Sequence, residues 1–241
     1  MKKTIIVMPI ANEEKTIGTV IEKIMKLPYD NLYLFAVMDS YSKDRTEEIV
    51  RKAEKTYNGR VKCIFYEESK GVVTCYLYGF HMALKCGAEY VIEMDGGGSH
   101  DPAEIPSFIK ALDDGYECVW GSRFVKGGSM RHQPLYRRLL SSGGTVLSNI
   151  VLGTKLKDMT SGFEAFQADI LRSMYLDKFL SRGHMYQTEM RFYCRNCHSK
   201  EIPIQYIGGE SSLKLKSVTE ALRILFQLKA HEQCIHKDSH T

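Results

Sequence analysis

The segment YVIEMDGGGSHDP, residues 90–102, places one carboxylate directly after a short apolar run and follows it with three glycines. A carboxylate at the end of a strand is the hard oxygen ligand that Mg²⁺ or Mn²⁺ prefers, so Asp95 is a candidate metal ligand. Gly96 and Gly97 carry no side chain and would let the backbone approach a diphosphate closely. The alternative is an ordinary strand-to-helix turn in which Asp101 caps the next helix. The glycines alone do not decide between these two interpretations.

The elements that would position Asp95 alternate between strands and helices. Short apolar, β-branched runs predict strands at residues 4–10, 31–40, 61–68, 88–95 and 117–124. The stretches between them predict helices at residues 12–27, 42–57, 71–87 and 101–115. Ser42 is the expected N-cap of the second helix. This alternation predicts an α/β fold with a parallel, doubly wound sheet.

Ligands of doubly wound proteins bind beyond the carboxyl ends of the strands, because these ends meet at one edge of the sheet. Four segments follow predicted strands at that edge, at residues 9–13, 39–44, 95–101 and 121–123. We therefore expect these four segments to converge on one crevice.

The pattern changes after Phe124. A loop and then a helix are predicted over residues 126–153, and residues 157–171 are predicted to be compact and turn-rich. A helix over 184–199, a strand over 200–209 and an amphipathic helix over 217–231 follow. The last residues, 231–241, are polar and are predicted to be a mobile tail.

Composition restricts the possible partners and compartments. The chain has 241 residues, 44% of them hydrophobic, which fits one large domain. A net charge of +4 argues against nucleic-acid binding, but it is compatible with an anionic small molecule or an anionic membrane surface. The first apolar run stops at Pro9, too early for a signal peptide, and no stretch approaches the roughly 18 apolar residues of a membrane span. A cytoplasmic protein, with contact to the membrane only from outside the bilayer, is expected.

Cysteine spacing raises a separate hypothesis. The segment CRNCH, residues 194–198, has the spacing of a c-type haem attachment site and could also begin a zinc site. No export signal supports haem attachment, and the remaining candidate zinc ligands lie in the tail, at His231, Cys234 and His236. We therefore interpret Cys194 and Cys197 as ordinary helix cysteines.

Several segments together resemble a known family. They are MPIANEE, MDSYSKDRT, ESKGVVTCYLYGF, EMDGGGSHDP, WGSRFVKGG, RRLLSS, DMTSGFEAF and IPIQYIGGESSLKLKS. Their order and spacing resemble family 2 glycosyltransferases with the GT-A fold, especially polyprenyl-phosphate (dolichol-phosphate) mannosyltransferases and glucosyltransferases. The resemblance implies a Rossmann-like, mostly parallel sheet with helices on both faces. It also implies a nucleotide-diphosphate sugar donor and a divalent metal ion, Mg²⁺ or Mn²⁺, on the diphosphate.

The resemblance assigns the donor site to the first half of the chain, residues 1–125. Base and ribose contacts are implied for Pro9, Asn12, Glu13, Asp39 and Ser40, where Ser40 replaces the family's second aspartate. Gly96 and Gly97 would lie against the diphosphate, and Asp95 and Ser99 would bind the metal. Family members carry Asp-x-Asp where this chain has Asp95-Gly96-Gly97, so the second acid is absent.

The acceptor site is expected in the second half, residues 126–230. Arg123 matches the family arginine of Gly-Ser-Arg and is expected to act in catalysis. The acceptor-phosphate contacts are implied for Arg137, Arg138 and Ser141, and a late phosphate contact for Lys214. For Arg137 and Arg138 the alternative is a solvated helix face. Glu189 lies where many glycosyltransferases carry an acid near the acceptor, although an exposed helix residue is an equal alternative.

The predicted function is inverting transfer of a hexose from a GDP- or UDP-sugar to a polyprenyl phosphate at the cytoplasmic membrane face. Membrane contact would come from the helices over residues 137–152 and 217–230. One alternative is a glycan or small-molecule hydroxyl acceptor, which needs a general base such as Glu189. Another is a non-catalytic relative that only binds nucleotide sugar, because Gly97 replaces an acid and Gly208 stands near a position where relatives carry arginine.

Overall fold

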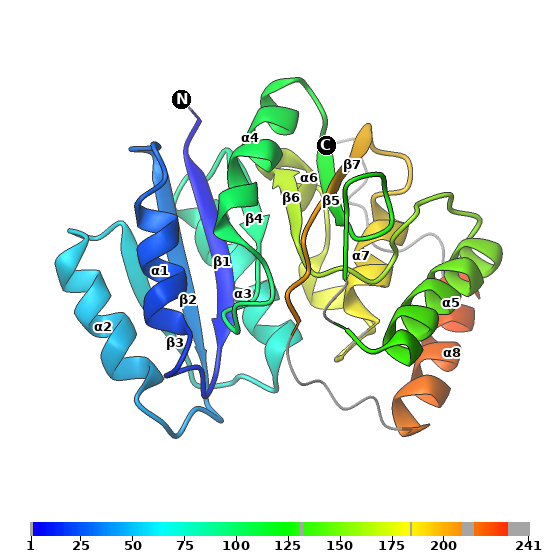
Figure 1. The fold of residues 1–241 in the computed structure, drawn as a ribbon, viewed down its shortest axis with the longest axis horizontal. Helices are drawn as coiled ribbons and strands as arrows, with labels where there is room; N and C mark the ends of the chain where they lie inside the picture. The colour runs from blue at the N-terminus through cyan, green and yellow to red at the C-terminus, as the bar shows by residue number, and fades with distance from the viewer. Residues whose placement is uncertain (1, 131–132, 184, 209–214, 231–241) are drawn as a thin grey trace.

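The computed structural model describes residues 2–130, 133–183, 185–208 and 215–230, and these residues form one mixed sheet flanked by helices (Figure 1). The sheet has the strand order β3-β2-β1-β4-β6-β5-β7. Its strands are β1 Thr4–Ile10, β2 Leu32–Asp39, β3 Val61–Tyr66, β4 Tyr90–Glu93, β5 Cys118–Ser122, β6 Glu164–Gln167 and β7 Ser199–Pro203. Every pairing is parallel except those of β6, which runs antiparallel to β4 and to β5.

Helices cover both faces of the sheet. The α-helices are α1 Ile17–Met25, α2 Thr46–Thr56, α3 Val72–Lys85, α4 Ile105–Asp113, α5 Leu135–Leu152, α6 Ala168–Arg172, α7 Tyr186–Tyr193 and α8 Leu215–Ala230. Two short 3₁₀ helices, η1 Pro102–Glu104 and η2 Leu176–Lys178, connect longer elements. Helices α5 and α8 pack against each other beyond the β7 end of the sheet (Figure 1).

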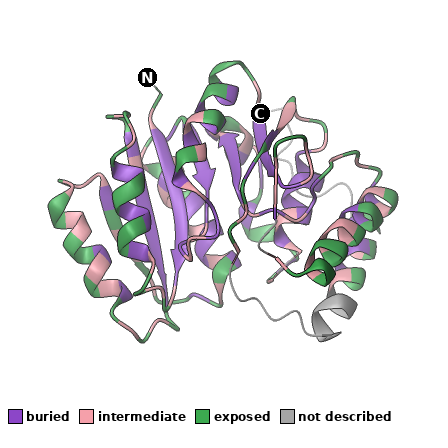
Figure 2. Cartoon of the chain, in the orientation of Figure 1, coloured by how far each residue is buried: buried purple, intermediate pink, exposed green. Residues whose placement is uncertain are grey.

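The core consists of two apolar layers, one on each face of the buried sheet (Figure 2). Successive side chains of β1 point alternately into the two layers. Ile5 and Val7 face α3, whereas Ile6 and Met8 face α1 and α4. This is the period of two that a strand imposes, and burial on both sides explains why β1 reads as a continuous apolar run. The predicted doubly wound α/β fold is therefore confirmed.

The prediction for residues 157–171 was incomplete, because this stretch contains β6 and α6. Strand β6 has only four residues and carries a charged and a polar side chain at its ends, so it lacks the apolar run that marks the other strands. Its pairing with β4 on one side and β5 on the other defines it. Such pairing is a tertiary property that local sequence does not display.

Two helix starts were also predicted too early. The chain bends at Asn12, whose φ is 57°, and α1 begins only at Ile17. Helix α2 begins at Thr46, and the predicted cap Ser42 instead accepts a hydrogen bond from the Asn12 amide at 3.2 Å. The Thr46 amide is satisfied by Asp44 Oδ1 at 3.0 Å. Both predicted first turns are in fact loops at the carboxyl edge of the sheet.

None of the helices in the described part of the chain combines the length and the hydropathy that crossing a bilayer requires. The sheet is continuous across residue 125, with β1 to β5 before it and β6 and β7 after it, so the two predicted halves share one sheet. The predicted tail, residues 231–241, lies outside the described residues.

Candidate active site

Asp95 lies just beyond the end of β4, at the carboxyl edge of the sheet. Its Oδ1 is buried and has no hydrogen-bond partner, and its Oδ2 is 3.5 Å from Nδ1 of His100. A buried carboxylate oxygen without a partner is costly unless a ligand completes it. The side chain as a whole is 37% exposed. The residues present therefore fit a hard cation that also binds a ligand from solution.

The three glycines after Asp95 meet three different constraints. A Cβ on Gly96 would stand 2.4 Å from Cγ2 of Ile10, so no side chain fits there. A Cβ on Gly97 would stand 3.2 Å from Oε1 of Glu13, so that carboxylate already occupies the space. Gly98 has a φ of +77°, a conformation that L-residues rarely adopt. A side chain is excluded at Gly96, strained at Gly98, and would require the Glu13 carboxylate to move at Gly97.

The loops after β1 and β2 are joined by side-chain hydrogen bonds. The Glu13 amide donates to Thr46 Oγ1 at 2.7 Å, and Asn12 Oδ1 accepts from the Lys43 amide at 2.9 Å. Thr16 Oγ1 lies 3.4 Å from the Gly96 carbonyl and so connects these loops to the turn after β4. The predicted convergence of the segments after β1, β2 and β4 is thus confirmed, and Pro9, buried in β1, lies beside them.

Asp39 and Ser40 form a network with Ser69, a residue that sequence reasoning did not single out. Ser69 Oγ donates to Asp39 Oδ1 at 2.9 Å and accepts from the Ser40 amide at 2.9 Å. Asp39 is buried, whereas Ser40 is exposed. The network fixes the Asp39 carboxylate before any ligand arrives. Ser69 belongs to the segment ESKGVVTCYLYGF, and its place in that segment could have marked it as a candidate site residue.

A cavity of about 510 Å³ opens beside Asp95. Its polar residues include Asp95, His100, Arg123, Arg137, Ser141 and Thr160. Its apolar wall comes from α3, α5, α8 and the residue before α7, and includes Val72, Leu140, Leu147, Met185, Leu222 and Leu225. The cavity is therefore polar at the carboxyl edge of the sheet and apolar between α5 and α8. The predicted site residues Asp95, Arg123, Arg137 and Ser141 lie in one cavity.

Arg123 is held in place by Asp158. Its Nε and Nη2 each donate to the Asp158 carboxylate at 2.7 Å, and Nη2 also donates to Ser141 Oγ at 2.9 Å and Thr160 Oγ1 at 2.6 Å. Burial opposes ionisation of Asp158, but the hydrogen bonds and charge of Arg123 hold the pKa of that carboxyl below its ordinary value. Asp158 and Thr160 were missed, although both belong to the segment DMTSGFEAF.

His100 is a further cavity residue that sequence reasoning did not assign. It is buried, and its ring stacks on Phe163 with centroids 4.9 Å apart. Burial lowers the pKa of His100, and the charge of Asp95 opposes that shift. The imidazole is therefore neutral near pH 7. Its Nδ1 is buried without a hydrogen-bond partner, so it can accept or donate at the mouth of the cavity.

Glu189 does not lie in the cavity, and it is not an exposed helix residue either. Its side chain is fully buried, with Oε1 accepting from the Leu180 amide at 2.7 Å and Oε2 from the Ser181 amide at 2.8 Å. Tyr193 also donates to Oε1, at 3.0 Å. A carboxylate with both oxygens satisfied by the protein holds a loop in place. The structure therefore places the Glu189 carboxylate away from the cavity, where a base for an acceptor hydroxyl is expected to lie.

Two other predicted residues, Ser99 and Arg138, lie apart from the cavity lining. Ser99 is buried, and its carbonyl accepts from the Ile207 amide at 3.0 Å, so His100 rather than Ser99 faces the cavity beside Asp95. Arg138 is exposed on α5, while its neighbour Arg137 lines the cavity. Lys214 lies outside the described residues.

Solved structures share this fold. Glucosyl-3-phosphoglycerate synthase from Mycobacterium tuberculosis in complex with uridine diphosphate matches 95% of this chain and 80% of its own, with a TM-score of 0.69 and 15% identity. The same enzyme in complex with Mn²⁺, uridine-diphosphate-glucose and phosphoglyceric acid matches with a TM-score of 0.68. At this identity the likeness concerns the fold alone. The chain therefore has the GT-A fold of glycosyltransferases.

The family is shown by sequence. The model of glycosyl transferase family 2 matches residues 5–174, so the chain belongs to this family of glycosyltransferases.

Three relatives are similar to this chain in sequence. An undecaprenyl-phosphate mannosyltransferase of Micrococcus luteus is 35% identical over 157 residues, 63% of this chain and 64% of that protein. A polyprenol monophosphomannose synthase of Mycolicibacterium smegmatis is 26% identical over 94% of this chain and 86% of that protein. A dolichol-phosphate mannosyltransferase of Pyrococcus furiosus is 29% identical over 95% of this chain and 64% of that protein. The matches thus span under two thirds of the Micrococcus and Pyrococcus proteins.

Proposed function

We propose that this family 2 glycosyltransferase transfers a hexose from a GDP- or UDP-sugar to a polyprenyl phosphate, with inversion at the sugar carbon. The names of the three relatives support a polyprenyl-phosphate acceptor. The observation that carries the proposal is the cavity of about 510 Å³, which is polar beside Asp95 and Arg123 and apolar between α5 and α8. A phosphate attached to an isoprenoid chain has this same division into a charged head and an apolar tail.

The acceptor phosphate would bind at the polar end of the cavity. Arg137 and the hydroxyl of Ser141 line it there, and Arg123 adds a guanidinium already oriented by Asp158. Arginine suits phosphate because its planar donors pair with two oxygens at once. The first isoprene units would then lie along Leu140, Leu147 and their neighbours in the apolar wall.

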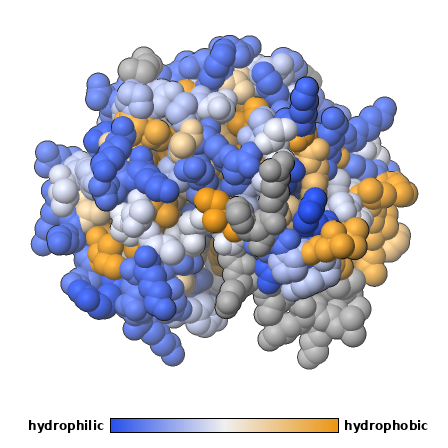
Figure 3. All heavy atoms as spheres, in the orientation of Figure 1, coloured by the Kyte–Doolittle hydropathy of each residue, from blue (hydrophilic) through white to orange (hydrophobic). Residues whose placement is uncertain are grey.

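The outer surface of α5 supports an acceptor delivered from a membrane. Hydrophobic side chains gather over this helix in Figure 3. The exposed ones on α5 are Leu135, Tyr136, Leu139, Val146 and Ile150, together with Leu140 and Leu147, which also line the cavity. A helix with this many exposed apolar residues can lie in a membrane interface, with the cavity opening toward the lipid. Peripheral contact with the cytoplasmic membrane face is part of the proposal.

The proposed reaction needs no general base. An acceptor phosphate oxygen is already anionic near neutral pH, and it attacks the anomeric carbon as the bond from that carbon to the diphosphate breaks. The electron pair leaves on the nucleoside diphosphate. Asp95 and the nearby Glu13 would hold a divalent ion. When bound, that Mg²⁺ or Mn²⁺ ion would neutralise the leaving diphosphate. Catalysis by this chain's residues is then mainly positioning and electrostatic stabilisation.

A transfer assay tests the proposal. Labelled GDP-mannose or UDP-glucose is incubated with polyprenyl phosphate and Mn²⁺, and labelled lipid is extracted and counted. Asp95→Asn should lower kcat/KM by at least about 100-fold, because a group that stabilises leaving-group charge is lost. Asp114→Asn, at an exposed helix end, is the matched control and should transfer normally.

Other results would redirect the assignment. Transfer only to a glycan or small-molecule hydroxyl would favour that acceptor class, with neutral His100 as the base to test. Binding of nucleotide sugar without turnover, unchanged by EDTA, would indicate a non-catalytic binding protein. Either result would overturn the lipid-phosphate proposal.

A further inference from the structure

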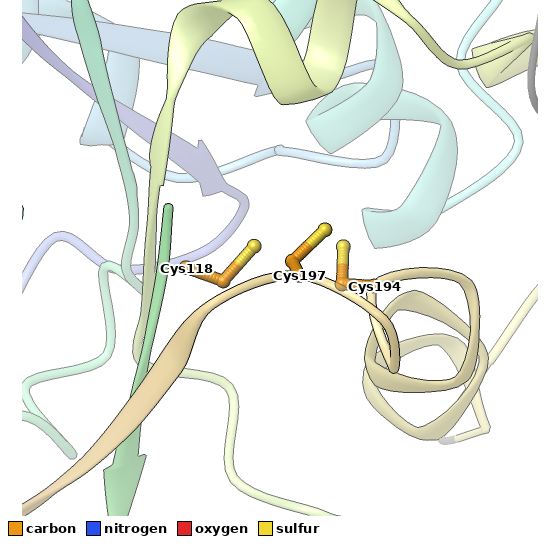
Figure 4. Close-up of side chains that lie close together, drawn as sticks. All are labelled: Cys118, Cys194 and Cys197. Atoms are coloured by element: carbon orange, nitrogen blue, oxygen red, sulfur yellow. The ribbon is translucent and has the colours of Figure 1, made fainter. Parts of the chain in front are cut away.

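Three cysteines meet at the amino-terminal end of β5, the end away from the candidate active-site loops. Cys118 is the first residue of β5, Cys194 directly follows α7, and Cys197 lies in the turn before β7. Their Sγ atoms all lie within 4.8 Å of one another. Figure 4 shows the three sulfur atoms gathered in one space between these segments. In the described part of the chain, this is the one group of three histidine, cysteine or acidic side chains close enough to hold a metal ion.

The backbone around the cluster is held by hydrogen bonds. The Cys197 amide donates to the Cys194 carbonyl at 3.0 Å, which forms a tight turn. The Glu117 amide donates to the His198 carbonyl at 2.7 Å, and the His198 amide donates to Glu117 Oε2 at 2.6 Å. The turn and the start of β5 are therefore locked together, and the three thiols are positioned before any ligand binds.

The spacing suits thiolate coordination of one ion. A zinc–sulfur distance of about 2.3 Å in tetrahedral geometry places sulfurs about 3.8 Å apart. Sulfurs already within 4.8 Å need only small side-chain rotations to reach that distance. Cys118 and Cys194 are buried, while Cys197 is partly exposed, so an ion could enter beside Cys197.

We propose that Cys118, Cys194 and Cys197 form a binding site for a single thiophilic metal ion, unrelated to the divalent ion of sugar transfer. Thiolates select Zn²⁺ and Cu⁺ over the hard cations Mg²⁺ and Mn²⁺. Three thiolates give Cu⁺ a complete trigonal shell, and they give Zn²⁺ three of four ligands with water as the fourth. The interpretation of Cys194 and Cys197 as ordinary helix cysteines did not foresee Cys118, which is distant in sequence.

Binding must displace protons from the thiols. Burial raises the pKa values of Cys118 and Cys194 well above their ordinary value, so both are protonated near neutral pH. Each bound ion therefore releases up to three protons. The bound ion would join the end of α7 to β5, and the other end of α7 carries Gln187, which lines the cavity beside Met185. The proposed site thus supports one wall of the active-site cavity from behind.

The test uses the full reduced chain and a cobalt probe. One equivalent of Co²⁺ per chain should produce a thiolate-to-cobalt charge-transfer absorption, which Zn²⁺ should abolish by displacement. A separate arm titrates Cu⁺ under anaerobic conditions and distinguishes the two ions by competition. Cys197→Ser, the least buried of the three changes, should weaken the apparent Co²⁺ affinity at least about tenfold. Cys86→Ser is the matched control, because Cys86 is also partly buried but lies outside the cluster.

Contrary outcomes are equally specific. No charge-transfer band in the reduced wild-type chain, together with no binding of Cu⁺, would overturn the proposal. An identical band in Cys197→Ser would overturn it too, since the ion would then lie elsewhere. Zn²⁺ should also raise the melting temperature of the wild type more than that of Cys197→Ser, because a ligand bound only by the folded state stabilises it.

Discussion

Glu13 accounts for the most unusual residue of the candidate site, Gly97. Relatives are expected to carry a second acid at this position, and here the Glu13 carboxylate lies 3.2 Å from where a Cβ would stand. Burial raises the pKa of Glu13, a hydrogen bond from Thr16 opposes the rise, and the charge of Asp95 adds to it. A second carboxylate therefore does stand near Asp95, but it comes from the loop after β1.

Alanine substitutions at Gly96 and Gly97 should have different effects. Gly96→Ala should destabilise the chain by about 1–3 kcal/mol, because its Cβ would overlap the stiff side chain of Ile10 at 2.4 Å. Gly97→Ala should cost less, because a carboxylate at the end of a flexible side chain can move away, but it should weaken Mn²⁺-dependent donor binding. Urea unfolding and calorimetry measure the two effects. Equal destabilisation by both substitutions would contradict this account.

The sequence alone was enough to identify candidate site residues at the ends of strands. It was not enough where the role of a residue depends on the direction in which its side chain points. Asp95 and Arg123 follow apolar runs, so their placement at the carboxyl edge could be predicted. Glu189 lies in a helix that is buried all round, so position in the chain did not reveal that it faces the loop at Leu180. Asp158 was missed because its partner, Arg123, is 35 residues away.

At the scale of elements, buried charges connect α7 to the sheet. Glu93 of β4 and Glu164 of β6 stand directly opposite each other, and Arg191 of α7 forms an ion pair with Glu164. Burial raises the pKa of Glu93 well above its ordinary value, and the charge of Glu164 raises it further. Burial also raises the pKa of Glu164 to about 7, and the charge and hydrogen bond of Arg191 oppose that rise. The two facing carboxyls therefore favour one shared proton, and Arg191 balances the remaining negative charge.

Removing Arg191 should therefore be costly. Arg191→Met leaves Glu164 buried without a counter-charge and should lower the free energy of unfolding by about 3–5 kcal/mol. The double variant with Glu164→Met should recover most of that loss, because an apolar pair of similar volume replaces the ion pair. Urea denaturation of the wild type and both variants provides the comparison. A double variant as unstable as the single one would show that lost packing, and not the unbalanced charge, causes the loss of stability.

At the scale of the whole molecule, Glu104 connects η1 to the segment after β7. Its Oε1 accepts from the Gln205 amide at 2.6 Å. Burial raises the pKa of Glu104 from 4.5 to about 7, the Gln205 hydrogen bond opposes that rise, and Asp101 adds to it. Between these two values the folded state binds more protons at this site than the unfolded state does.

The sign of the pH dependence follows. Stability contributed by protonated Glu104 is fully present below about pH 4.5 and is lost as pH rises through about 7. Glu104→Gln should remove this loss, so the variant gains melting temperature over the wild type as pH increases from about 5 to about 8. Calorimetric scans of both chains give the difference in melting temperature at each pH. The contributions of the other titrating groups, which both chains share, cancel in this difference. A difference that does not change with pH would contradict the assignment.

The reversed direction of β6 determines where insertions and deletions would alter the candidate active site. Every other strand delivers its residues to the carboxyl edge as it ends, but β6 does so as it begins, through Asp158 and Thr160. Insertions and deletions between α5 and β6 would therefore reshape the acceptor cavity directly. The chain directly after β6 meets the opposite edge, where the Ala168 amide donates to the Glu89 carbonyl at 2.9 Å, so length variation at that turn lies away from the carboxyl edge.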